Sequence, residues 1–146
     1  MIQTKSIIAT IKRTMRSVAN VSNSKRIFTD RLPLKIKMFI YENMNGKSIA
    51  FAEENAESKV GRYIITMNDN TLLSFNHKGE WTKVVNTAVG VPTGIIPPAI
   101  FRFAYFCFPE SIIVAITKQS TGYLTTLSND VSLKFNRQGQ IYGFAN

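Results

Sequence analysis

YIITMNDNTLLSFNHKGEW, residues 63–81, returns as YLTTLSNDVSLKFNRQGQI, residues 123–141, and this pair of stretches decides the fold. In both copies apolar residues alternate with polar ones, a pattern typical of antiparallel strands with one buried face. Asn and Asp between the alternating runs favour tight turns, because both tolerate a positive φ. A glycine, Gly79 or Gly139, closes the next hairpin in each copy. Two copies of one supersecondary unit are therefore predicted.

A helix is predicted ahead of each copy. Leu32-Pro33 and Ile96-Pro97 mark the two starts, since proline is tolerated where a first-turn N–H has no helical partner. Apolar residues then recur at the i, i+3, i+4 spacing of one helix face: Ile36, Phe39 and Ile40 in the first copy, and Ile100, Phe103 and Ala104 in the second.

The predicted fold class is α+β, with two tandem helix-plus-four-strand repeats. The repeats form one eight-stranded antiparallel sheet that carries both helices on one face. The first strands are expected at 47–54 and 111–118, and the last at 80–85 and 140–144. The predicted organisation of this single fused domain is a basic arm at 1–29, repeats at 30–86 and 95–146, and a linker at 87–94.

The doubled pattern resembles the PepSY-like, β-lactamase-inhibitor-like family. The residues that carry the resemblance are the Leu-Pro or Ile-Pro helix start, Tyr63 and Tyr123 at the strand starts, and Phe-Asn-x-x-Gly at 75–79 and 135–139. The resemblance implies a periplasmic or secreted bacterial protein that binds or inhibits another protein and has no chemistry of its own. In the related inhibitor fold the sheet face opposite the helices grips an enzyme. No inhibitory motif is present in this sequence to carry over.

The formal net charge of +9 is concentrated at the N-terminus. Residues 1–29 hold six basic and no acidic side chains, whereas residues 30–146 hold 12 basic and 9 acidic ones. No nucleic-acid partner is therefore expected. Within the arm, Ile7, Ile8, Ile11, Met15 and Val18 follow the spacing of an amphipathic helix.

Four interpretations of this arm stay open. A solvated extension, or a short helix against a sheet edge, is favoured. A degraded export signal, a helix on an anionic membrane surface and a transit peptide are the alternatives. No apolar run approaches the length of a transmembrane span, so none is expected.

Catalytic and metal-binding constellations are not found in the sequence, so no enzyme and no cofactor are expected. The only histidine, His77, falls on a hairpin turn, and one His with one Cys does not build a zinc site. Glu53, Glu54 and Glu57 form a small acidic cluster without the spacing of a known calcium loop. Cys107, the only cysteine, aligns with Asn43 at a core-type helix position and is expected to be a buried, inert thiol.

The second helix differs from the first on its outer side. Lys35, Lys37, Tyr41 and Glu42 of the first helix align with Ala99, Phe101, Tyr105 and Phe106 of the second. A helix that is apolar all round is normally covered on all sides. Phe101, Tyr105 and Phe106 are therefore expected to contact a second copy of the chain or the 7–18 segment of the arm.

The sequence predicts a non-enzymatic protein-binding or inhibitor-like module of the bacterial cell envelope. Its partner would be an unknown protein, such as an envelope enzyme. The candidate partner contacts are aromatic and turn residues: Tyr63, Trp81, Tyr123, Tyr142, Asn76, His77, Asn136 and Arg137. For Tyr63 and Tyr123 core packing is favoured over contact. The alternatives are a small-molecule or peptide binder on the sheet face, and an assembly protein that dimerises through its apolar second helix.

Overall fold

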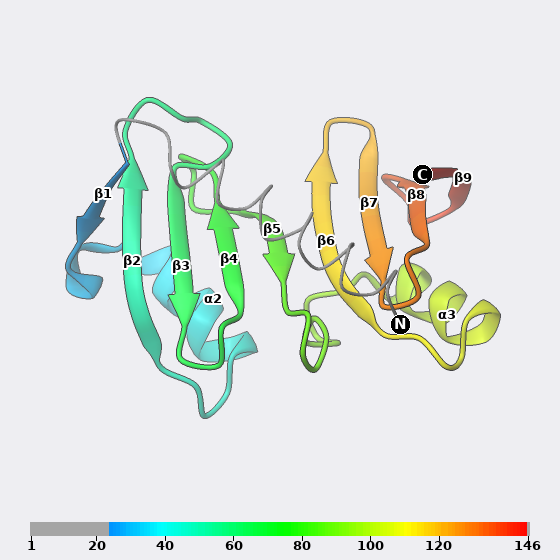
Figure 1. Cartoon of the computed structure of the whole chain (residues 1–146). Coiled ribbons are helices and arrows are strands. Elements are labelled where there is room, and N and C mark those ends of the chain that lie inside the picture. Colours follow the sequence, from blue (N-terminus) through cyan, green and yellow to red (C-terminus); the bar gives the residue numbers. More distant parts are fainter. Residues whose placement is uncertain (1–23, 146) are drawn as a thin grey trace. The chain divides into compact units, whose positions relative to one another are not determined.

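The computed structural model describes residues 24–145, which form two compact units, residues 24–84 and 85–145 (Figure 1). The first unit contains β1 (Ser24–Ile27), the 3₁₀ turn η1 (Thr29–Arg31), α2 (Leu34–Asn43), β2 (Ile49–Asn55), β3 (Tyr63–Met67) and β4 (Leu72–Phe75). Its last strand, β5 (Trp81–Val85), ends at the boundary. The second unit contains α3 (Pro98–Cys107), β6 (Ile113–Gln119), β7 (Gly122–Leu127), β8 (Ser132–Asn136) and β9 (Ile141–Ala145).

Strands of the first unit follow one another in chain order and pair antiparallel. Ala52 pairs with Ile65, and Ile65 pairs with Leu73. All three side chains are fully buried, so they lie on the face that the helix covers. Their strand neighbours, such as Glu53 and Ile64, point to the opposite face, because successive side chains in a strand alternate.

The second unit has the same antiparallel arrangement. Ile116 pairs with Thr125, and Thr125 pairs with Leu133, on the face that α3 covers. The strand that follows the helix in each unit also carries a register shift near its start, between Ile49 and Phe51 in β2 and between Ile113 and Ala115 in β6. Such bulges bend a strand and increase its twist.

Each helix covers one face of its own unit (Figure 1). The predicted inner positions are confirmed, since Ile36, Ile40, Ile100 and Ala104 are buried. Both helices begin directly after a proline with an extended backbone, as the sequence predicts. The side chains of Phe39 and Phe103 reach the sheet, where they meet phenylalanine rings of β4 and β8.

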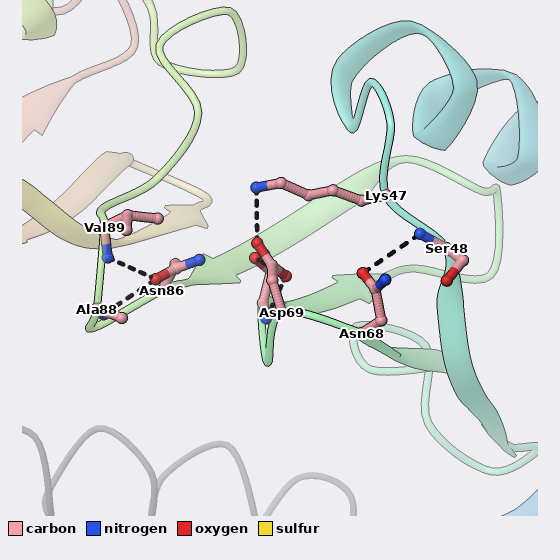
Figure 2. Close-up of polar contacts among 8 residues, drawn as sticks. Lys47, Ser48, Asn68, Asp69, Asn86, Ala88 and Val89 are labelled. Atoms are coloured by element: carbon pink, nitrogen blue, oxygen red, sulfur yellow. Dashed lines mark hydrogen bonds and ion pairs between the residues drawn. The ribbon is translucent and has the colours of Figure 1, made fainter.

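The turns are held by side chains of the residue types that predicted them. Asn70 and Asp130 have φ values of 70° and 76°, and the predicted left-handed glycines Gly79 and Gly139 have φ values of 81° and 82°. Figure 2 shows two of the polar contacts at the β3–β4 turn: the Lys47 ammonium lies 2.6 Å from the Asp69 carboxylate, and the Ser48 N–H donates to Asn68. The predicted strands and hairpins are confirmed at these positions.

The residues after β5 belong to the second unit and pair with its first strand. The backbone N–H groups of Asn86 and Val91 donate to the carbonyls of Val114 and Ile113. The Asn86 side chain accepts from the N–H groups of Ala88 and Val89 at 3.0 Å each (Figure 2). The segment predicted as a linker at 87–94 is therefore tied by hydrogen bonds to β6.

The strand count of eight is wrong, because the described residues contain nine strands. The additional strand is β1, which falls inside the segment predicted as an arm. Ser24-Lys25-Arg26-Ile27 carries no apolar alternation, so nothing in its sequence signals a strand. Its position depends on partners elsewhere in the chain: Arg26 pairs with Glu53 of β2, and its guanidinium lies 3.9 Å from the centre of the Phe51 ring. The union of the two units in one sheet stays a prediction.

Candidate binding surface

The candidate surface is the outer side of α3, which we call the α3 outer face and define as Phe101, Tyr105 and Phe106. The helix is held in place by side chains on its inner side, which faces the sheet. Ile100 is fully buried, and Phe103 meets the Phe135 ring edge-on with 5.7 Å between the ring centroids. Because these inner residues fix the rotation of the helix, positions 105 and 106 point away from the sheet.

Large aromatic side chains are exposed on this face. Tyr105 is 68% exposed and Phe106 is 86% exposed. Phe101 is half-buried and stacks on Tyr105, with 5.9 Å between the ring centroids and 23° between the ring planes. Arg102 is the only charged residue of the helix. Exposed apolar patches of this kind mark interaction sites in soluble proteins.

The first helix gives a comparison within the same chain. Its outer side also exposes Leu34, Met38 and Tyr41, but these residues are interspersed with Lys35, Lys37 and Glu42. Lys37 donates to the carbonyl of Asp30 at 2.7 Å. An aromatic outer face with a single charged residue on its helix is therefore a property of the second unit.

The sequence predicts that the arm or a second copy of the chain covers the α3 outer face. Among the described residues, however, Tyr105 and Phe106 are exposed. The arm segment 7–18, one of the two expected covers, lies outside the described residues. The second expected cover, another copy of the chain, is not tested by a single chain.

The prediction for Cys107 is wrong, because its side chain is exposed. Cys107 is the last residue of α3, and the buried face of the helix ends one turn earlier, at Ala104. Cys107 lies seven residues after Ile100, a spacing that returns to the inner side of a helix. It would be buried only if the helix and the core beneath it continued past this point, but the helix ends at Cys107. The aligned Asn43 is only half-buried and donates to the Phe39 carbonyl.

The four turn residues named from sequence fall into two kinds. Asn76 and Asn136 stabilise their own turns, since each side-chain carbonyl accepts two backbone N–H groups, at 2.9 to 3.0 Å. His77 and Arg137 are exposed, and they contact the β2–β3 connection and the β6–β7 connection, respectively. The backbone N–H of His77 donates to the Lys59 carbonyl, and the Arg137 guanidinium donates to the Ser120 carbonyl at 2.8 Å.

The aromatic candidates also separate by exposure. Tyr63, Trp81 and Tyr123 are half-buried, whereas Tyr142 on β9 is 56% exposed. Sequence reasoning missed Phe144, which is 62% exposed two residues further along β9. Phe144 occupies the position of Val84 in the first unit, which is fully buried, so the sequence alignment gave no sign of its exposure.

Ionisable side chains of the described residues are mostly paired or on the surface. The Glu54 carboxylate accepts from Arg62 at 2.8 Å, and this hydrogen bond raises the pKa of Arg62. Burial lowers the pKa of Lys83, a half-buried lysine on β5 that the sequence did not single out. Residues 24–145 hold no group of three or more His, Cys, Asp or Glu side chains that could bind a metal ion.

The acidic cluster predicted at 53–57 is divided by the strand geometry. Glu53 and Glu54 are neighbours on β2 and therefore point to opposite faces of the sheet. Glu57 lies beyond the strand end, in the β2–β3 connection. In the part of the chain that the structure describes, no helix is long and apolar enough to cross a membrane.

The described residues form small α+β units, and comparison with known proteins gives the family of the chain. Residues 61–142 match the family described as "Putative beta-lactamase-inhibitor-like, PepSY-like". The chain belongs to this PepSY-like family, which confirms the resemblance found in the sequence.

Solved structures share the fold. A "putative calcium-regulated periplasmic protein" from Bacteroides thetaiotaomicron superposes with a TM-score of 0.79 at 24% identity, covering 86% of this chain and 98% of that one. A "putative periplasmic protein" from Bacteroides vulgatus gives a TM-score of 0.78 at 25% identity, covering 87% and 100%. A second periplasmic protein of B. vulgatus, of unknown function, gives 0.76 at 22%, covering 84% and 99%. A search of curated proteins found no match.

Proposed function

We propose that this chain is a non-enzymatic protein-binding module of the bacterial cell envelope. Membership of a family described as inhibitor-like and structural likeness to periplasmic proteins support the envelope assignment. The observation that carries the binding role is the exposed aromatic α3 outer face, next to which Arg102 is the only charged residue of the helix. Its aromatic side chains have the composition of interface anchors, because they bury large areas and have few rotatable bonds.

The proposed mechanism is steric occlusion of a partner protein. The α3 outer face anchors the partner, and Tyr142, His77 and Arg137 are the exposed members of the contact set named from sequence. The half-buried residues Tyr63, Trp81 and Tyr123 support these contacts from within the units. Neither the family description nor the neighbours identify the partner.

The experiment is affinity capture from a bacterial envelope extract with the purified chain, quantified by mass spectrometry. Tyr105→Lys with Phe106→Lys adds two charges to the α3 outer face. Leu34→Lys with Tyr41→Lys adds the same two charges to exposed positions of α2 and is the matched control. A protein retained by the wild type and by the control, but lost by the α3 variant, supports the proposal. Equal retention by all three chains contradicts it.

A second candidate function is self-assembly, since the same face would also serve an α3-to-α3 contact between two copies. Light scattering after size-exclusion chromatography separates the two functions. A mass that doubles with concentration in the wild type and stays monomeric in the α3 variant favours assembly. If the wild type is a monomer at all concentrations, the result favours binding of a different protein.

A calcium-dependent function is not proposed for this chain. One structural neighbour is described as calcium-regulated. In residues 24–145, however, the Asp69 and Glu54 carboxylates pair with Lys47 and Arg62, and no acidic group converges on a common point.

We also infer that the two units are tandem copies of one ancestral segment. The shared element order, the bulges at matching positions and the matching positive φ values support this inference. Exchange of residues 76–79 for residues 136–139 tests it: equivalent turns should interchange with a change in unfolding free energy below about 1 kcal/mol. A larger loss in both directions contradicts the equivalence.

A further inference from the structure

In the part of the chain that the structure describes, β9 is the last strand of the second unit and has a strand on one side only. Among residues 24–145, β9 pairs with β8 and with no other strand. Figure 1 shows β9 (red) at the end of that unit, next to β8. An unpaired edge presents a row of N–H and C=O groups that can hydrogen-bond an added strand.

The other terminal strand, β1, carries the protection that edge strands usually have. Lys25 and Arg26 occupy its two central positions. β9 reads Ile-Tyr-Gly-Phe-Ala and contains no charge and no proline. A bulge leaves Tyr142 as an extra residue, and regular pairing then covers Gly143 to Ala145. The open edge available to a partner is therefore this uncharged segment.

Gly143 follows the bulged residue Tyr142, and neither its φ nor a lack of space for a Cβ requires glycine there. Its φ is not in the left-handed region, and a Cβ built on it would meet no atom within 4 Å. Its partner across the β8–β9 pair is Lys134. The missing side chain leaves the surface open between Lys134 and the edge. Glycine within a strand often marks a bulge, as at the neighbouring Tyr142, or the close approach of another backbone.

The positive charge near the β9 edge favours an acidic binding partner. Lys134 forms no ion pair with a carboxylate of the described residues, whereas the Lys47–Asp69 and Arg62–Glu54 ion pairs lie in the first unit. Residues 85–145 contain four basic and two acidic side chains. A second copy paired through β9 would place two Lys134 side chains on one face without a carboxylate between them. An acidic segment compensates this charge.

We propose that the open edge of β9 binds an extended peptide segment of a partner protein as an added strand, with an acidic side chain opposite Gly143 that pairs with Lys134. Two strand spacings, about 9.6 Å, separate β8 from such a strand, and lysine and glutamate side chains together span this distance. Phe144 projects on the other face and is 62% exposed. The peptide therefore carries an apolar residue directly beside the acidic one, because adjacent side chains alternate.

The test is a selection from a displayed library of random dodecapeptides against the full chain, followed by fluorescence-anisotropy titration of the enriched peptides. We expect an enriched acidic residue next to an apolar one. Lys134→Glu should weaken binding at least tenfold, and replacing the acidic residue of the peptide with lysine should restore binding to that variant. Lys78→Glu, the same charge change on an exposed turn of the first unit, is the control and should alter the affinity less than twofold.

A second variant and a backbone readout keep the test independent of folding and of general charge attraction. Gly143→Val adds a side chain where a Cβ would meet no atom within 4 Å, and it should also weaken binding while the circular-dichroism spectrum stays native. Bound peptide should protect the β9 amides from hydrogen exchange. Enrichment without an acidic residue, equal affinity of Lys134→Glu, or unprotected β9 amides would overturn the inference.

Peptide binding at β9 does not involve the α3 outer face, so each of these two proposals can fail without the other. The α3 variant with lysines at 105 and 106 should keep its affinity for the selected peptides. Dimerisation through β9 without any peptide, abolished by Gly143→Val, would mean that a second copy is the occupant and would overturn the peptide assignment.

Discussion

The Phe103 ring meets the Phe135 ring edge-on, with 5.7 Å between the ring centroids and 82° between the ring planes, and this pair fixes α3 on its unit. Phe39 and Phe75 form the same contact in the first unit, at 5.3 Å and 84°. Phe75 and Phe135 are fully buried. The position of the α3 outer face therefore depends on this aromatic contact together with the buried Ile100 on the inner side of the helix.

Removal of that contact should be costly and similar in both units. Phe135→Ala and Phe75→Ala should each lower the free energy of unfolding by about 3–5 kcal/mol, because each leaves a cavity under a helix. Urea denaturation monitored by circular dichroism measures the loss. Tyr105→Ala, on the exposed side of α3, serves as the control and should change stability by less than about 0.5 kcal/mol. Comparable losses at Phe135 and Tyr105 would contradict the assigned rotation of α3.

Gly122 and Gly143 of the second unit should respond oppositely to alanine. Gly122 has a φ of 149°, and a Cβ there would lie 1.9 Å from the Phe135 carbonyl oxygen. Gly122→Ala should therefore destabilise the chain by more than about 1 kcal/mol, whereas Gly143→Ala should stabilise it by about 0.4–1 kcal/mol by restricting the unfolded chain. Thermal denaturation of both variants decides the matter. A destabilised Gly143→Ala would show that the glycine has a structural role within the chain.

The Lys47–Asp69 pair predicts a pH dependence of stability. Burial opposes ionisation of Asp69, but hydrogen bonds from Lys47 and from the hydroxyl and N–H of Thr71 outweigh it and lower the pKa of Asp69. A folded-state pKa below the unfolded value means that the stabilisation is present above about pH 4 and is lost as the pH falls through the folded pKa. Asp69→Asn keeps the turn acceptor and removes the charge, so it should cost about 0.5–1 kcal/mol at pH 7 and nothing near pH 2.

The second unit supplies the control for this pair. Asn129 aligns with Asp69, and Ser111 stands where the first unit has Lys47. Asn129→Asp should therefore give no stabilisation at pH 7. A pH-independent difference between wild type and Asp69→Asn would rule out the ion pair as its cause.

The thiol of Cys107 should be accessible in the folded chain. Because Cys107 is exposed, a thiol reagent such as dithionitrobenzoate should label it completely under native conditions, at a rate within about tenfold of that in urea. Slow labelling that speeds up only on unfolding would restore the buried thiol that the sequence favours.

Periodicity and turn chemistry predicted most of the secondary structure. The helices after Pro33 and Pro97, the strands at 63–67 and 123–127, and the left-handed glycines at 79 and 139 all follow from local rules. These features are predictable because each depends on residues close in sequence.

Features that depend on distant residues were not predictable. β1 is a strand only because β2 offers it an edge, and Cys107 is exposed because the helix and its buried face end there. The exposure of Phe144 also depends on residues that are distant in sequence. Its aligned residue, Val84, is fully buried, so burial at that position differs between the two units although the pattern of the strand is the same.

Part of the candidate surface was predictable and part was not. The replacement of Lys37 and Glu42 by Phe101 and Phe106 indicated an unusual second helix from composition alone. Which of these side chains stay exposed depends on the rotation of α3 about the Phe103–Phe135 contact, which only the folded structure gives.

The most direct test of the binding role is site-specific photo-crosslinking in living bacteria. Benzoylphenylalanine replaces Phe106 on the α3 outer face or, as the control, Leu34 on α2, which is 72% exposed. Our account predicts a covalent adduct with another envelope protein from position 106 and none from position 34. No adduct from position 106, or the same adducts from both positions, would contradict the claim that the α3 outer face is the binding surface.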